Sequence, residues 1–123
     1  MTTIRRKHRV QVAQGTGHHA ALTKLLLKAF QQAMPTAACT TLVLCKGGVP
    51  ELPEGANKHR TLLVIVPECN QRAAAASWHQ AWSSDVVVDP HGYAIGFCAI
   101  DCRHSDLMRA AATLSRFGFN WWY

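Results

Sequence analysis

The 123-residue chain is 49% hydrophobic and 16% charged, which suits one folded domain and excludes an intrinsically disordered tail. No segment approaches the roughly 18 uninterrupted apolar residues of a membrane span, so we expect no membrane partner. The formal net charge of +6 favours an acidic partner. We therefore expect a single domain over residues 1–123, with a flexible basic arm at residues 1–7.

Hydrophobic periodicity divides the first half of the chain into alternating strands and helices. Alternating valines predict a first strand over residues 8–13. An apolar stripe at helical spacing predicts a helix over residues 18–34, which Pro35 ends. Apolar, β-branched segments predict further strands over residues 40–45 and 61–66. The second of these is apolar without interruption, which predicts burial on both of its faces.

A long polar connection, residues 47–59, separates these two strands. It contains Pro50, Pro53 and Gly55. Connections of this length exceed the usual range in a small domain, and they commonly serve a function when they are ordered. We expect a loop here that is either mobile or functional.

The second half of the chain continues the alternation. Asn70 predicts the N-cap of a second helix that reaches Trp82. Short apolar segments at residues 86–88 and 93–100 predict a β-hairpin, because the turn residues Asp-Pro-His-Gly occupy positions 89–92 between them.

A third helix and a short strand complete the predicted order. Ser105 predicts the N-cap of this helix, and Gly118 fits the left-handed position just after its end. Residues 120–123 then predict a final strand. The order β-α-β-β-α-β-β-α, with a last β, predicts an α/β fold, arranged as an α+β two-layer sandwich. Its first six elements match the βαββαβ order and so admit a ferredoxin-like core.

The positive charge is concentrated in the first half of the chain. The first 50 residues carry +7 and contain no acidic residue, whereas the remainder carries −1. Such asymmetry favours contact with nucleic acid or with an acidic protein surface, and a solvated basic edge that aids solubility is the alternative. The candidate anion contacts lie in this half: Arg5, Arg6, Lys7, Arg9, Gly15, Gly17, His18, Lys24, Lys28 and Lys46.

A glycine motif precedes the first predicted helix. Residues 15–20 read Gly-Thr-Gly-His-His-Ala, which fits G-x-G-x-x-A and lets a backbone approach a phosphate. No acidic residue follows about 20 positions later to bind a ribose, and Lys46 ends the next strand instead. We therefore expect no dinucleotide cofactor, and the motif predicts either a general anion site or a tight strand-to-helix turn.

The five cysteines suggest two kinds of chemistry. Residues 1–10 lack the apolar core of a secretory signal, so we expect a reducing, cytoplasmic setting without disulfides. A C-x3-C-x-H segment resembles part of a zinc site, but a second ligand pair is missing, and buried structural cysteines are the simpler interpretation. The candidate ligands are Cys98, Cys102, His104 and His91.

A Cys/His hydrolase is the alternative to a binding protein. Cys69 precedes the second helix, whose N-terminus would lower the pKa of its thiol. His79 and His104 are the candidate bases. No local sequence signature supports this chemistry, so the leading hypothesis assigns no catalytic residue and no metal.

Three aromatic residues end the chain: Trp121, Trp122 and Tyr123. Exposed tryptophan and tyrosine side chains are typical of interfaces, and docking onto the protein's own core is the alternative. The leading hypothesis is a small cytoplasmic accessory or inhibitory factor without catalysis that contacts nucleic acid or an acidic protein surface. A hydrolase, with or without zinc, is the first alternative, and a structural homodimer joined through these aromatics is the second.

Overall fold

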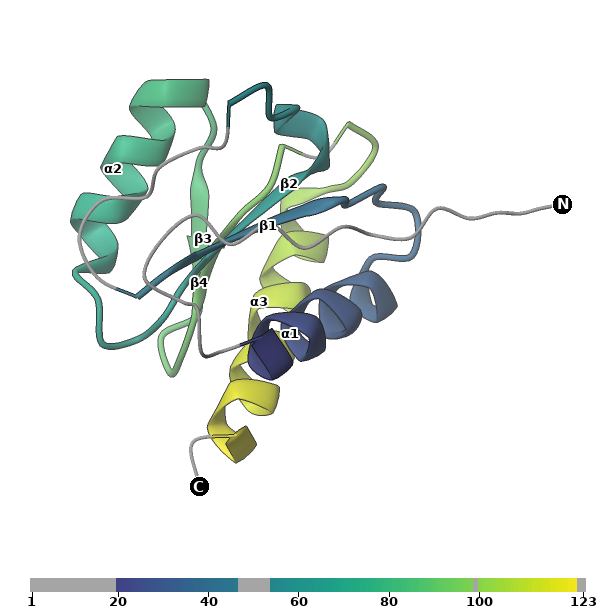
Figure 1. Ribbon diagram of the computed structural model, residues 1–123, viewed down its shortest axis with the longest axis vertical. Helices are drawn as coiled ribbons and strands as arrows, with labels where there is room; N and C mark the ends of the chain where they lie inside the picture. Colours follow the sequence, from purple (N-terminus) through teal and green to yellow (C-terminus); the bar gives the residue numbers. More distant parts are fainter. Residues whose placement is uncertain (1–19, 47–53, 99, 122–123) are drawn as a thin grey trace, which may run out of the picture.

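The computed structural model describes residues 20–46, 54–98 and 100–121 (Figure 1). The predicted strand at residues 8–13, the basic arm and the glycine motif up to His19 lie outside the described residues. So do residues 47–53 of the long connection.

A four-stranded mixed sheet forms the centre of the molecule. Its strands are β1 (Thr41–Cys45), β2 (Thr61–Ile65), β3 (Val86–Val88) and β4 (Ala94–Gly96), in the spatial order β1-β2-β4-β3. β1 and β2 are parallel, while β4 runs antiparallel to both of its neighbours. The predicted hairpin is confirmed: β3 matches the predicted residues 86–88, and β4 is shorter than the predicted residues 93–100.

Three α-helices cover the sheet. α1 (Ala20–Ala33) and α3 (His104–Trp121) lie side by side on one face, whereas α2 (Gln71–Trp82) lies on the other (Figure 1). The α/β class is therefore confirmed. α1 and α3 form a two-layer sandwich with the sheet, and α2 adds a cover to the opposite face. Of the described helices, none combines the length and hydropathy required to cross a lipid bilayer.

The residues of β2 alternate between the two faces. Leu62 and Val64 pack in the cluster beneath α1 and α3, and Leu63 and Ile65 pack in the cluster beneath α2. All five residues of β2 are buried, which confirms the prediction from its uninterrupted apolar sequence.

The sheet departs from a simple βαββαβ reading. The first strand of that order, predicted over residues 8–13, lies outside the described residues, so the complete ferredoxin-like arrangement stays untested. β1 and β2 pair in parallel, with Thr41 opposite Thr61, although consecutive strands without an intervening α-helix ordinarily form an antiparallel hairpin. Parallel pairing requires a crossover of about a dozen residues or more, and residues 46–60 are long enough to provide it.

Side-chain capping defines the start of α2. The Asn70 side chain accepts a hydrogen bond from the Ala73 N–H at 3.1 Å, as the sequence predicts. At the other end Ser83 adopts a left-handed conformation with φ of 54°, and its N–H donates to the His79 carbonyl at 2.7 Å. Such a terminal turn is typical of helix C-termini.

The boundaries of α3 differ from the prediction at both ends. Ser105 lies within the helix, which begins at His104. The Asp106 carboxylate accepts from the Arg103 N–H at 3.0 Å, so the helix is capped two positions earlier than predicted. Gly118 does not end the helix, which continues to Trp121. A glycine permits the left-handed conformation without requiring it, so it cannot stop a helix by itself. The predicted strand at residues 120–123 is therefore wrong up to Trp121, and the last two residues lie outside the described chain.

Candidate functional site

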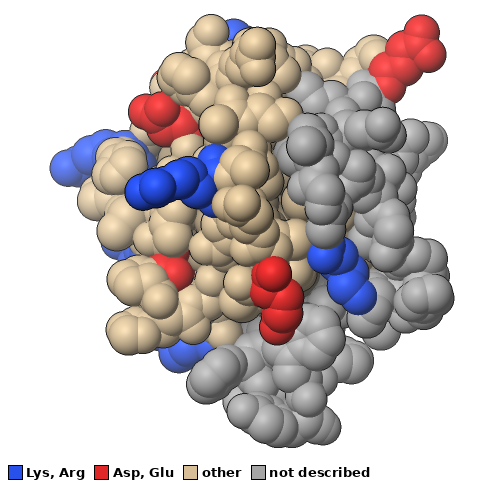
Figure 2. Space-filling view, turned by 90° about the vertical axis from the view of Figure 1, so that its left-hand side faces the viewer, with Lys and Arg blue, Asp and Glu red and all other residues tan. Residues whose placement is uncertain are grey.

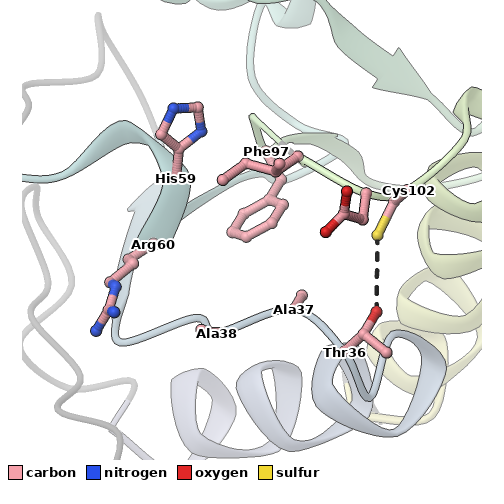
Figure 3. Close-up of a pocket in the computed structure, with 9 residues that line it drawn as sticks. Thr36, Ala37, Ala38, His59, Arg60, Phe97 and Cys102 are labelled. Atoms are coloured by element: carbon pink, nitrogen blue, oxygen red, sulfur yellow. Dashed lines mark hydrogen bonds between the residues drawn. The ribbon is translucent and has the colours of Figure 1, made fainter.

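A pocket of about 190 Å³ opens at the sheet edge where β1 and β2 begin and β4 ends (Figure 3). Four segments line it: residues 36–38 between α1 and β1, His59 with Arg60, Phe97 after β4, and residues 100–102 before α3. The pocket thus joins parts of the chain that are far apart in the sequence.

A short 3-10 helix, η1 (Lys58–Arg60), contributes His59 and Arg60 to the lining of the pocket. Asn57 organises it: its side chain accepts from the His59 N–H at 2.8 Å, and its carbonyl accepts from the Arg60 N–H at 2.9 Å. The Arg60 carbonyl in turn accepts from the Thr40 N–H at 2.9 Å, which attaches η1 to the start of β1. All three side chains of η1 are exposed on this anchored backbone.

The His59 ring connects η1 to the segment after β4. Its Nδ1 lies 2.9 Å from the Cys98 carbonyl oxygen. Because a carbonyl oxygen can only accept, Nδ1 must carry the proton in this bond. Nε2 is then the ring nitrogen that remains for a ligand, as an acceptor when the ring is neutral and as a donor when it is protonated.

Phe97 and Ile100 are the large apolar side chains that line the pocket. Phe97 is only 4% exposed, and its ring meets that of Phe30 edge to face, with centroids 5.1 Å apart. Ile100 is 72% exposed, the most of the large apolar side chains in the described chain. The pocket therefore has a fixed aromatic wall and an uncovered aliphatic rim.

The polar groups of the pocket are separated from one another. Figure 3 shows Arg60 and Cys102 on opposite sides of the pocket, with the Phe97 ring between them. The Cys102 Sγ lies 4.0 Å from the Thr36 hydroxyl. Asp101 and Arg60 are both exposed, and neither forms an ion pair with any described residue.

The cations of η1 were not among the predicted anion contacts. Residues 58–60 read Lys-His-Arg. Lys58 and His59 end the long connection of residues 47–59, where the polar composition predicted only a loop, and Arg60 directly precedes the strand predicted from residue 61. This basic tripeptide was the signal in the sequence that pointed to a cationic site. Its position beside the pocket depends on the parallel pairing of β1 with β2, which no local pattern indicated.

Only three of the predicted anion contacts can be placed. Lys24 and Lys28 are exposed on α1, and Lys46 follows β1 and is half-buried. The remaining contacts, from Arg5 to His18, lie outside the described residues, so their role stays a prediction.

The α2 side of the molecule has a mixed surface. On the part of this face that the structure describes, Figure 2 shows basic and acidic side chains interspersed among uncharged residues. Mixed charges of this kind suit solubility better than polyanion binding. An anion-binding surface is therefore better sought around α1, η1 and the pocket.

The environment of Cys69 opposes the predicted nucleophile. Burial, followed by the neighbouring Cys45 thiol, raises the pKa of Cys69 to about 12. Its thiol donates to the Cys45 carbonyl at 3.2 Å. The candidate base His79 instead pairs with Asp85 at 3.2 Å, and His104 is exposed at the start of α3. The position before α2 thus does not produce the lowered pKa expected of a helix N-terminus.

We expect the Cys69 thiol of the folded protein to react slowly with iodoacetamide. A pKa of about 12 in place of 9.0 lowers the thiolate fraction roughly a thousandfold near neutral pH. Raising the pH toward 12 should accelerate alkylation, because the thiolate is the reactive form. Peptide mapping by mass spectrometry in native buffer and in urea measures this difference, with Cys69→Ser as the control. A rate that is already maximal near pH 7 would restore the hydrolase hypothesis.

The predicted zinc ligands do not assemble among the described residues. Nowhere in that part of the chain do three or more His, Cys, Asp or Glu side chains come close enough to hold a metal ion. Cys102 lies beside Thr36, while His91 and His104 are exposed. The described structure therefore gives the zinc alternative no support.

The aromatic end of the chain is only partly placed. The backbone of Trp121 ends α3, so any interface there would continue a helix and not an edge strand. The interface role of Trp121, Trp122 and Tyr123 stays a prediction.

No protein-family model matches the chain, and no curated protein or solved structure shows significant similarity to it. Evidence for a function therefore comes from the chain's own charges and pocket.

Proposed function

We propose that this protein is a non-catalytic nucleic-acid-binding protein. The observation that carries the proposal is a set of exposed cations without acidic partners. Lys24 and Lys28 on α1, and Lys58 and Arg60 on η1, form no ion pair within the described chain. Phosphates of a polyanion would supply the missing counter-charges and release condensed cations on binding.

The distribution of charge along the chain supports the same partner. The first 50 residues carry seven Lys or Arg residues and no Asp or Glu. Cations with no acidic residue between them suit a nucleic-acid backbone, which repeats one negative charge at regular intervals. An acidic protein surface has the same sign of charge but offers neither a regular repeat nor bases for an apolar pocket. We therefore favour nucleic acid, and binding only to acidic proteins would contradict this choice.

We expect four cations of the N-terminal segment to dominate the salt dependence of binding. Changing Arg5, Arg6, Lys7 and Arg9 together to Ala should reduce the slope of log affinity against log salt by roughly one unit per lost phosphate contact. Fluorescence anisotropy of labelled single- and double-stranded oligonucleotides across a salt series measures the slope.

A matched variant controls for net charge. Changing four exposed arginines elsewhere to Ala removes the same charge and should alter the slope less; these residues are Arg72, Arg103, Arg109 and Arg116. Equal slopes for both variants would show that only total charge matters. The absence of nucleic-acid binding by the parent chain at low salt would overturn the proposed function.

A further inference from the structure

We propose that the pocket between η1 and the segment preceding α3 binds one unstacked nucleotide. The base would enter against Phe97 and Ile100, and the phosphate would meet the cations of η1. This proposal rests on the proposed function and names the ligand unit that the pocket takes. The nucleotide could be free or part of a single strand, and the experiment below distinguishes these sources.

The size of the pocket limits its occupant. Pockets for drug-sized ligands commonly measure about 300–1,000 Å³, whereas this one measures about 190 Å³. It therefore suits one ring system and excludes a dinucleotide or a segment of double helix. A base that has left its stack is a flat ring system of this scale.

The apolar side chains of the pocket match the faces of such a ring. Phe97 is held by its edge-to-face contact with Phe30, so the aromatic wall is positioned before any ligand binds. Ile100 is largely exposed at the rim and would be covered by the base. Inorganic phosphate alone would leave Ile100 exposed.

The polar groups match the two ends of a nucleotide. Arg60 at one end of the pocket offers the charge and the planar fork that suit a phosphate. Asp101 can accept from an N–H or amino group on the edge of a base. Neither Arg60 nor Asp101 is neutralised by an ion pair with a described residue, so both charges remain for the ligand.

Nuclear magnetic resonance titration of the full chain tests the proposal. The probes are cytidine and adenosine monophosphate, a short single-stranded oligonucleotide, and inorganic phosphate. We expect both mononucleotides and the strand to shift the backbone amides of Ala37, Arg60 and Cys102, and phosphate to shift mainly those of η1. Mononucleotides that leave these amides unmoved would overturn the proposal.

Variants of exposed residues separate base binding from simple charge attraction. Arg60→Ala and Ile100→Ser should each weaken mononucleotide binding by about tenfold, while Arg72→Ala on α2 should not. Base binding and simple charge attraction predict opposite effects of Asp101→Ala on the affinity for a mononucleotide. Loss of an acceptor for the base weakens binding by about tenfold, whereas loss of a negative charge strengthens the binding of a bare anion. Stronger binding by Asp101→Ala would therefore overturn the proposal.

The result also separates this inference from the proposed function. If strands bind with a salt-dependent affinity while the pocket variants behave as the parent, the pocket proposal fails and the nucleic-acid function stands. If mononucleotides shift the pocket amides but strands bind no more tightly than mononucleotides, the pocket takes free nucleotides and the nucleic-acid function fails.

Discussion

Replacing Trp78 by Ala is expected to lower the free energy of unfolding by about 3–5 kcal/mol. Trp78 is 1% exposed and fills the space between α2 and the sheet, where it packs in one cluster with Val43, Ile65 and Ala94. Small domains are stable by only about 5–15 kcal/mol, so this loss removes a large part of the total. Urea unfolding followed by circular dichroism measures the change.

Two further tryptophan variants test the physical reason. Trp82 is half-buried and meets Trp78 edge to face at 4.8 Å, so Trp82→Ala should cost distinctly less. The Trp78 indole N–H is buried without a hydrogen-bond partner among the described residues. Trp78→Phe removes this unsatisfied donor together with some volume, and it should cost less than Trp78→Ala. Equal costs for Trp78→Ala and Trp82→Ala would contradict the assignment of Trp78 as the main filler of the α2 face.

Replacing Gly92 by Ala should lower the free energy of unfolding by about 1–3 kcal/mol through overpacking. A Cβ atom at position 92 would collide with the Oγ and Cβ of Ser115. Ser115 cannot easily move, because its hydroxyl accepts from the Tyr93 N–H at 2.9 Å and donates to the Ala111 carbonyl at 2.9 Å. The added methyl would therefore separate the β3–β4 hairpin from α3.

A double-mutant cycle distinguishes this collision from a general loss of turn flexibility. Ser115→Gly removes the colliding side chain, at its own cost in helix stability and in the lost hydrogen bonds. Gly92→Ala should cost less in that background than in the parent, because the two positions are in direct contact. Chemical unfolding of the four proteins gives the coupling, and strictly additive costs would contradict the contact.

Local signals in the sequence predicted most of the elements that the structure describes. The cap at Asn70, the helix after it and the uninterrupted apolar strand β2 each follow from neighbouring residues. Such features depend on side chains within a few positions of one another, so periodicity and capping preferences detect them. The end of α3 was predicted wrongly. Glycine is common just after the end of a helix, but it permits the left-handed conformation without requiring it, and α3 continues through Gly118 to Trp121.

The candidate site could not be predicted in the same way. Its cations come from η1, its aromatic wall from the end of β4, and its carboxylate from the segment before α3. The raised pKa of Cys69 likewise depends on burial beside Cys45, a residue 24 positions earlier in the chain. Sequence position suggested the opposite shift, because it shows the approaching helix and not the neighbouring thiol.

By itself the sequence determined the excess of positive charge, the alternation of helices and strands, and the burial of β2, because each is a property of composition or of near neighbours. The tertiary structure alone decided the parallel pairing of β1 with β2, the need for glycine at position 92 and the convergence of four segments on one pocket. These features arise from contacts between residues distant in the chain. Their free energy depends on shape and register across the sheet, which no local pattern of residues encodes.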